Sequence, residues 1–335
     1  MTRKTRITTE VDFEQDGLQQ GFLQLPHSVH RSAYGWIGIP IVVIKNGTGP
    51  TVLLTAGIHG DEYEGQIALM KLCQELQPAD VRGRIIILTA ANFPAVIAGL
   101  RTSPIDDLNL NRAFPGDPNG PPTAAMADYI ENELLPRADF SIDLHSGGSS
   151  LMYLPSALAC RVQSDELSKR QTDMLKAFAA PISCLVEVHG EDRIMLAAAA
   201  RANVPAIGTE LGGGGTTSLE SISVAVQGVD RVLRHLGFTP DRGGGEPTHA
   251  NRLMEICGSD YFVYSPDYGI WEPLADLGDD VQQGQPAAKV FFPTMPWRQP
   301  VLAHFQHDGT VLCKRTPGAV ERGDCLFHLA TECVE

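Results

Sequence analysis

The sequence lacks long hydrophobic runs, an excess of basic residues and closely spaced cysteine pairs. No run approaches the roughly 20 apolar residues of a membrane-spanning helix, and the N-terminal MTRKTRITTEVDFEQD has no apolar core like that of a signal peptide. Lysine and arginine total 26 against 40 aspartates and glutamates, a net charge of -14, which argues against a nucleic-acid partner because phosphate contacts need a basic face. The seven scattered cysteines indicate reduced thiols. We therefore expect a cytoplasmic protein with no membrane or nucleic-acid partner.

The first 245 residues alternate between strand and helix patterns. Continuous apolar runs predict strands at 41–44, 52–55, 85–89, 140–144, 184–188 and 206–211. Helical spacing of apolar residues predicts helices at 64–76, 123–135, 164–179, 193–202 and 219–236. Together they predict an α/β domain with a covered, largely parallel sheet over 1–245, in which 1–40 is a peripheral β segment.

The pattern changes at residues 239–250, TPDRGGGEPTHA, which are typical of a linker. Strand-like runs follow without a convincing helix, so we expect a small all-β domain over 246–335. DDVQQGQPAAKV and GAVERGDCLFHL form a near-repeat at a spacing of 39 residues, with Gly284 aligned on Gly323. This resembles the two halves of a biotinyl/lipoyl-type barrel-sandwich domain. The lysine of such carriers is missing from the corresponding TMPWRQP, so the resemblance implies the fold and not the carrier role.

The stretch TVLLTAGIHGDEYEG joins a buried strand to a helix through a polar loop. His59 and Glu62 lie three residues apart in this loop, a spacing at which an imidazole and a carboxylate can reach one metal ion. A catalytic zinc commonly keeps three protein ligands, and two histidines with one glutamate are such a set. The pair alone is a weak signal, because a solvated polar loop after a strand has the same composition.

Two later strands end in residues that complete such a site. His145 ends the strand in FSIDLHSGG. Asp143 points to the same side of this strand and could orient the imidazole of His145 without itself binding the metal. Glu210 ends an apolar strand before four glycines and suits a general base that takes a proton from activated water. The carboxyl ends of strands are where α/β sheets bind ligands. Alternatively, His145 is hydrogen-bonded only to the backbone, and Glu210 caps a helix or is solvated.

Residues 100–116, LRTSPIDDLNLNRAFPG, form a polar loop with two arginines. Arginine recognises carboxylates in a bidentate manner, so Arg112 with Asn111 could clamp a substrate carboxylate. Arg101 could stabilise the oxyanion that forms when water attacks a carbonyl. The alternative is a surface loop with solvated arginines.

HGDEYEG, NLNRAFPG, DLHSGG and GTELGG, in this order, resemble the succinylglutamate desuccinylase/aspartoacylase family, which is related to zinc carboxypeptidases. The resemblance implies a three-layer sandwich with a mostly parallel mixed sheet and a zinc-dependent hydrolase that removes an acyl group from an N-acyl amino acid. The family's usual Asp-Leu-Asn-Arg reads with Asn109 in first place here, which leaves the clamp residues intact. The implied roles are one zinc per chain on His59, Glu62 and His145, Glu210 as base, Arg101 on the scissile carbonyl, and Asn111 with Arg112 on the α-carboxylate.

One departure from the family bears on the substrate. Aspartoacylases carry an arginine for the second carboxylate of N-acetylaspartate at a place that falls near Ala199 here, with Arg201 close by. Glu191 and Asp192 would instead suit an ammonium group. The pattern is similar to the bacterial branch that removes acetyl from Nα-acetyl-L-2,4-diaminobutyrate in ectoine degradation, and we expect that substrate.

Several alternatives stay open from the sequence. The chain could be a succinylglutamate desuccinylase/aspartoacylase-type enzyme, a carboxypeptidase-like hydrolase, or a non-catalytic zinc or amino-acid binding protein. His189 is a rival residue for the site, and His27 with His30 form a separate His-x-x-His pair. A homodimer is the expected assembly.

Overall fold

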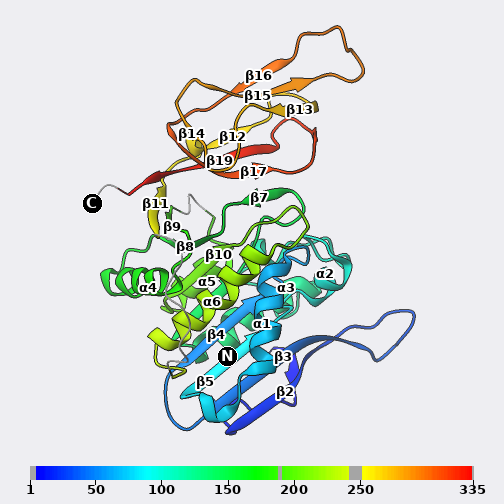
Figure 1. Ribbon diagram of the computed structural model, residues 1–335. Helices are drawn as coiled ribbons and strands as arrows, with labels where there is room; N and C mark the ends of the chain where they lie inside the picture. The colour runs from blue at the N-terminus through cyan, green and yellow to red at the C-terminus, as the bar shows by residue number, and fades with distance from the viewer. Residues whose placement is uncertain (1–4, 188–190, 241–250, 334–335) are drawn as a thin grey trace.

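The structure is a computed structural model that describes residues 5–187, 191–240 and 251–333. Figure 1 shows an α/β part with helices on both faces of a sheet and, stacked on it, a part made only of strands. No helix of the described residues is long and apolar enough to span a membrane. All seven cysteines are free thiols.

Six strands form the centre of the sheet in the α/β part. They are β3 (Trp36–Asn46), β4 (Thr51–Ala56), β5 (Gly83–Leu88), β6 (Phe140–Leu144), β8 (Ser156–Cys160) and β10 (Ala206–Glu210). They lie in the order β3-β5-β4-β6-β10-β8. The neighbours β5, β4, β6 and β10 are parallel, whereas β3 runs antiparallel to β5 and β8 runs antiparallel to β10. The carboxyl ends of β4, β6 and β10 therefore meet at one edge of the sheet.

The sheet extends beyond this centre on both sides. On one side lie β2 (Gly17–Pro26) and β1 (Thr8–Thr9), and on the other β9 (Ile182–Val186), β11 (Arg252–Ile256), β19 (Cys325–Glu332), β17 (Gly309–Arg315) and β14 (Asp280–Val281). β12 (Phe262–Tyr264) pairs with β19, and β7 (Leu151–Tyr153) pairs with β17. One sheet thus joins the α/β part to the C-terminal strands.

Helices cover the two faces of the sheet over two separate cores. α1 (Tyr63–Glu75), α4 (Asp165–Phe178) and α6 (Leu219–His235) bury their apolar sides in one core. α3 (Pro122–Tyr129) and α5 (Met195–Arg201) do so in the other, and α2 (Phe93–Ala98) lies near the same face. This is the expected three-layer sandwich.

The C-terminal strands also form a four-stranded antiparallel sheet. It has the order β16-β15-β13-β18, made of β13 (Gly269–Pro273), β15 (Pro286–Phe291), β16 (Val301–His304) and β18 (Ala319–Val320). The near-repeat corresponds to β14–β15 and β18–β19, and each copy turns at a glycine with positive φ, Gly284 (82°) and Gly323 (92°). In the first copy the short strand β14 belongs to the large sheet and the long strand β15 to the four-stranded sheet. In the second copy the short strand β18 belongs to the four-stranded sheet and the long strand β19 to the large sheet. A third core lies between them.

The predicted helices and strands are present with small shifts of their ends. The predicted helix at 123–135 continues past α3 as a π-helical turn (Ile130–Leu134) and a 3-10 turn (Leu135–Arg137), so Pro136 lies inside the last turn. The sequence did not predict α2, β7 or β8. The predicted domain boundary falls within 241–250, outside the described residues, and stays a prediction.

Candidate active site

The loop after β4 places His59 and Glu62 at the carboxyl edge of the sheet. Gly60 makes this path possible, because a Cβ there would lie 1.9 Å from the carbonyl oxygen of Ala95 in α2. The Gly60 N–H donates to the carbonyl of Leu100 at 2.8 Å. Contact with the backbone of α2 thus fixes the loop just where both polar side chains leave it.

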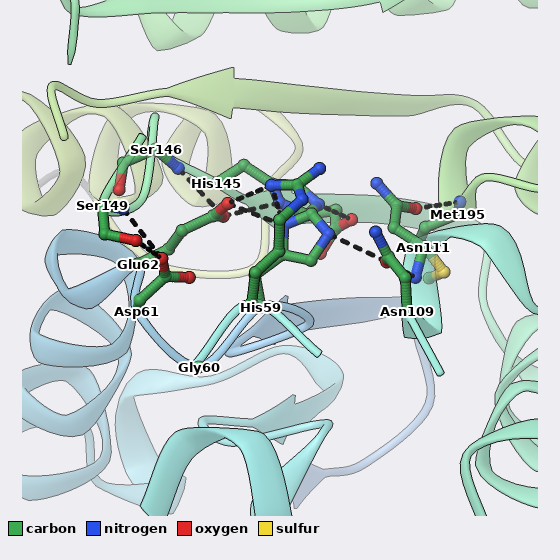
Figure 2. A network of polar contacts seen from close by, with 12 residues as sticks. His59, Gly60, Asp61, Glu62, Asn109, Asn111, His145, Ser146, Ser149 and Met195 are labelled. Atoms are coloured by element: carbon green, nitrogen blue, oxygen red, sulfur yellow. Dashed lines mark hydrogen bonds and ion pairs between the residues drawn. The ribbon is translucent and has the colours of Figure 1, made fainter. Parts of the chain in front are cut away.

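His145 comes from the end of β6, the strand beside β4. Its backbone is held by Thr209 of β10, whose hydroxyl accepts from the His145 N–H at 3.0 Å and donates to the His145 carbonyl at 3.1 Å. Figure 2 shows His59, Glu62 and His145 pointing toward one another. Oε1 of Glu62 lies 2.6 Å from Nδ1 of His59, and Oε2 lies 2.8 Å from Nδ1 of His145. One donor atom from each of the three lies within 4.8 Å of the others.

Two further residues hold the far nitrogens of the histidines. Nε2 of His145 lies 2.7 Å from Oδ2 of Asp143, which in turn accepts through Oδ1 from the Thr55 hydroxyl at 2.6 Å. Nε2 of His59 lies 3.0 Å from Oδ1 of Asn109. Because both oxygens are acceptors, a proton on each Nε2 suits these contacts, and both Nδ1 atoms point toward the Glu62 carboxylate. Three electron-rich groups that converge in this way fit a divalent metal ion with imidazole and carboxylate ligands.

Burial and mutual charge set the protonation of this cluster. Burial lowers the pKa of His59, and the opposing carboxylate of Glu62 does not fully compensate. Burial alone would raise the pKa of Glu62, but the two imidazoles hold it well below its usual range. Burial also disfavours a charged His145, yet the carboxylates of Asp143 and Glu62 outweigh it and raise its pKa well above the ordinary value. The protein without metal therefore keeps a proton on His145.

Glu210 reaches the same cavity from the end of β10. The cavity has a volume of about 310 Å³ and is lined by His59, Glu62, His145 and Glu210, among others; we call it the metal-side cavity. Oε2 of Glu210 is buried and has no hydrogen-bond partner among the described residues. Burial, with the charge of Glu62, raises the pKa of Glu210 to about 8. A buried carboxyl group with a free oxygen beside a metal site can accept and return a proton.

The loop with the two arginines also lines the metal-side cavity. A terminal guanidinium nitrogen of Arg101 lies 3.4 Å from Nδ1 of His59 and 3.5 Å from Oε1 of Glu62. Asn111 accepts through its side-chain oxygen from the N–H of Met195 at 2.8 Å, so its amide group is fixed against α5. Arg112 pairs with Glu191 at 2.9 Å. The structure therefore brings the residues predicted for the metal, the reaction and the α-carboxylate to one cavity: Arg101, Asn111 and Arg112 join His59, Glu62, Asp143, His145 and Glu210.

A match to a family model identifies the protein family. The succinylglutamate desuccinylase/aspartoacylase catalytic domain matches residues 48–236. The chain belongs to this family. It is 41% identical to N-alpha-acetyl-L-2,4-diaminobutyric acid deacetylase of Halomonas elongata over 98% of this chain and 96% of that protein.

Solved structures of family members match over the whole length of the chain. The product-bound ectoine utilization protein EutE (DoeB) of Ruegeria pomeroyi superposes with a TM-score of 0.93 at 39% identity and covers 98% of this chain and 99% of its own. The apo structure of that protein gives a TM-score of 0.85 at 37% identity, with 98% and 100% covered. The chain is thus more similar to the product-bound form than to the apo form.

Asn109 is the site residue whose role the sequence did not reveal. The sequence placed Asn109 in the family's Asp-Leu-Asn-Arg motif but did not predict that its side chain contacts His59. The bond to Nε2 of His59 depends on the path of the 101–112 loop above the sheet, which no strand or helix pattern describes. The aspartate that the family usually has at this position could have indicated the contact, because a carboxylate is a common hydrogen-bond partner of a metal-bound histidine.

The residues that the sequence connected with the substrate side chain lie in several places. Neither Ala199 nor Arg201 lines the metal-side cavity: Ala199 is fully buried in the core, and Arg201 pairs with Glu131 at 2.7 Å. Glu191 is engaged by Arg112, and Asp192 lies at a separate surface hollow. Ile194 and Leu196 face the cavity from this segment instead.

Two predictions concern other histidines. His189 lies outside the described residues. His27 and His30 lie in the connection between β2 and β3, and within the described ranges the group His59, Glu62 and His145 is the one with metal-binding geometry.

Proposed function

We propose that the protein hydrolyses the amide bond of Nα-acetyl-L-2,4-diaminobutyrate and releases acetate and 2,4-diaminobutyrate. The observation that carries the reaction type is the convergence of Glu210 with the donor atoms of His59, Glu62 and His145 in one cavity. The deacetylase of Halomonas elongata, 41% identical, supports the choice of substrate.

The proposed cofactor is one zinc ion per chain, held by His59, Glu62 and His145. Such an ion lowers the pKa of a water molecule and polarises the acyl carbonyl. Asp143 and Asn109 keep the two imidazoles in the tautomer that offers Nδ1 to it.

Two side chains of the protein transfer the proton of the attacking water and stabilise the charge on the carbonyl oxygen. Glu210 in its carboxylate form takes a proton from the attacking water and later delivers it to the leaving amine. The guanidinium of Arg101, which borders the Nδ1 of His59 and the Glu62 carboxylate, stabilises the negative charge that develops on the carbonyl oxygen. These two groups act from different elements, the end of β10 and the 101–112 loop.

Asn111 and Arg112 hold the α-carboxylate of the substrate in this proposal. The side chain of Arg112 is 41% exposed and is already paired with Glu191, so its guanidinium is oriented before the substrate arrives. Of the described residues that line the metal-side cavity, Arg101 and Arg112 are the only lysines or arginines. A second carboxylate, as in N-acetylaspartate or succinylglutamate, would find no further lysine or arginine among these described lining residues.

Turnover of matched substrates tests this proposal. The zinc-loaded protein is assayed with Nα-acetyl-2,4-diaminobutyrate, N-acetylaspartate, N-succinylglutamate and dipeptides, with acetate or amine release as the readout. We expect the highest kcat/KM for the first. Equal or better turnover of an acidic substrate or a dipeptide would contradict the proposal.

Replacement of Glu210 by glutamine separates an enzyme from a binding protein. We expect kcat/KM to fall by about 10²- to 10⁴-fold while the zinc content stays near one per chain. Full activity of Glu210→Gln would refute the mechanism.

Location and assembly complete the proposal. The free thiols support a cytoplasmic location. A homodimer is the proposed assembly, and light scattering during gel filtration measures it.

A further inference from the structure

A second cavity adjoins the metal-side cavity and is the larger of the two. It has a volume of about 550 Å³, and its walls come from β8, β9 and α5 on one side and from β11, β12 and β19 on the other. Arg112, Tyr153 and Glu210 line both cavities, so the two spaces join beside the proposed base and the proposed carboxylate clamp. A substrate whose α-carboxylate is held by Arg112 can thus place its amide toward Glu210 and its side chain in the second cavity.

His328 of β19 lines this second cavity and is left without polar contacts. Its side chain is only 8% exposed, and neither ring nitrogen has a hydrogen-bond partner among the described residues. The ring stacks on Phe262, with 4.0 Å between centroids and an interplanar angle of 14°, and meets the edge of Tyr153 at 6.2 Å. A buried polar group without a partner costs free energy, so its nitrogens are available for a ligand in the cavity.

The charges around the cavity favour a cation as that ligand. Of the described lining residues, Arg112 is the only lysine or arginine, whereas Glu187, Glu191 and Glu210 are acidic. Burial lowers the pKa of His328 to about 4, so its imidazole is neutral near pH 7 and adds no positive charge. A neutral ring nitrogen accepts a hydrogen bond from an ammonium group, and neighbouring aromatic rings also attract a cation.

We propose that His328 recognises the side-chain amino group of the substrate by accepting a hydrogen bond from its ammonium in the second cavity. This inference rests on the proposed function and extends it, because it assigns the selection of diamino acids to a residue of the C-terminal strands. The metal-binding residues His59, Glu62 and His145 do not line the second cavity and have no part in that selection.

A pair of substrates that differ by one amino group tests the assignment. Nα-acetyl-2-aminobutyrate has the carbon skeleton of Nα-acetyl-2,4-diaminobutyrate without the side-chain amine. For His328→Phe, which keeps an aromatic ring on Phe262, we expect kcat/KM for the diamino substrate to fall by about 10- to 100-fold, mainly through KM. The value for the aminobutyrate substrate should change less than about threefold, and His328→Gln, which retains an acceptor, should recover part of the loss.

His307→Phe is the matched control. His307 also stacks on an aromatic ring, Tyr261, with 4.4 Å between centroids, but it lines neither cavity. We expect its kinetics to equal those of the wild type with both substrates. If His328→Phe lowers both substrates equally, or lowers neither, the assignment is wrong.

Binding measured without turnover separates this inference from the proposed function. In protein labelled with ¹⁵N at histidine, the signals of His328 are those that His328→Phe loses. We expect them to shift when 2,4-diaminobutyrate is added and to stay in place with 2-aminobutyrate. This outcome supports the subsite even if the wild type hydrolyses a different acyl derivative, whereas equal shifts with both ligands, or none with either, overturn it.

Discussion

Asn109 accepts a hydrogen bond from Nε2 of His59 at 3.0 Å, whereas a carboxylate, Asp143, serves the corresponding nitrogen of His145. The two histidines that face Glu62 are thus oriented by groups of different charge. A carboxylate makes an imidazole a more basic ligand, and a neutral amide only fixes its direction. The usual aspartate of the family motif would change that balance at His59.

Substitution of Asn109 should change the affinity for zinc. Asn109→Ala frees the ring of His59, and we expect the affinity to fall by about 10- to 100-fold. Asn109→Asp should bind zinc more tightly than the wild type. Competition with a chromophoric chelator measures both, and an unchanged affinity of Asn109→Ala would show that the bond does not position the ligand.

Zinc binding should release protons at pH 7. Without metal, Asp143 and Glu62 overcome the effect of burial and raise the pKa of His145 above the ordinary value, and burial raises that of Glu210 to about 8, so both groups hold a proton at pH 7. A cation needs the lone pair of His145 and favours the carboxylate of Glu210. We therefore expect the release of about two protons and an affinity that rises with pH as the two groups lose their protons, Glu210 at about pH 8.

Calorimetry in buffers with different heats of ionisation counts these protons. Glu210→Gln cannot ionise at this position, so it should release about one proton fewer than the wild type. The same count in both proteins would mean that Glu210 is already ionised without zinc.

The two arginines of the 101–112 loop should differ in their kinetic effects. Arg101 faces the place where negative charge develops, so Arg101→Met should lower kcat by about 10²- to 10³-fold. Arg112 is proposed to hold a carboxylate that does not react, so Arg112→Met should chiefly raise KM. Arg201→Met is the control, since Arg201 pairs with Glu131 away from the metal-side cavity. Effects of the same kind from both variants would contradict the division of roles.

Gly60 should be essential for stability as well as for the site. A Cβ would meet backbone atoms of α2 at 1.9 Å, so we expect Gly60→Ala to reduce the free energy of unfolding by about 1–3 kcal/mol or more. Gly318→Ala is the comparison, because nothing lies within 4 Å of a Cβ there, and we expect a change within about 0.5 kcal/mol. Urea denaturation measures both values; equal stability of the two variants would contradict the steric argument.

Sequence patterns predicted the part of the site that lies on regular elements. His145 and Glu210 end apolar strands, and His59 and Glu62 follow one, so the meeting of parallel strand ends at one edge was sufficient to bring them together. Arg101, Asn111 and Arg112 were assigned from the chemistry of their side chains, whereas the contact of Asn109 with His59 depends on the path of an irregular loop. His328 stands in a buried strand far from any metal pattern, and only the packing of β19 against β12 places it beside the second cavity.

The same limits apply to the elements of the fold. α2 spans only six residues and begins with Phe93 and Pro94, too short for a helical period to show. β8 reads Ser-Ala-Leu-Ala-Cys, without the β-branched residues that distinguish a strand. Both were missed because neighbouring elements, and not local preference, hold them in place.

The exchange of places in the C-terminal repeat has a consequence for how substrate specificity can be altered. One copy of the repeat supplies β19, which carries His328 into the large sheet, while the corresponding long strand of the other copy, β15, lies in the small sheet away from both cavities. With His328 in its proposed role, one copy of the repeat contributes a strand to ligand recognition and the other copy does not. Substitutions in β19 and β12 would then change the accepted side chain without altering the hydrolytic residues at the ends of β4, β6 and β10.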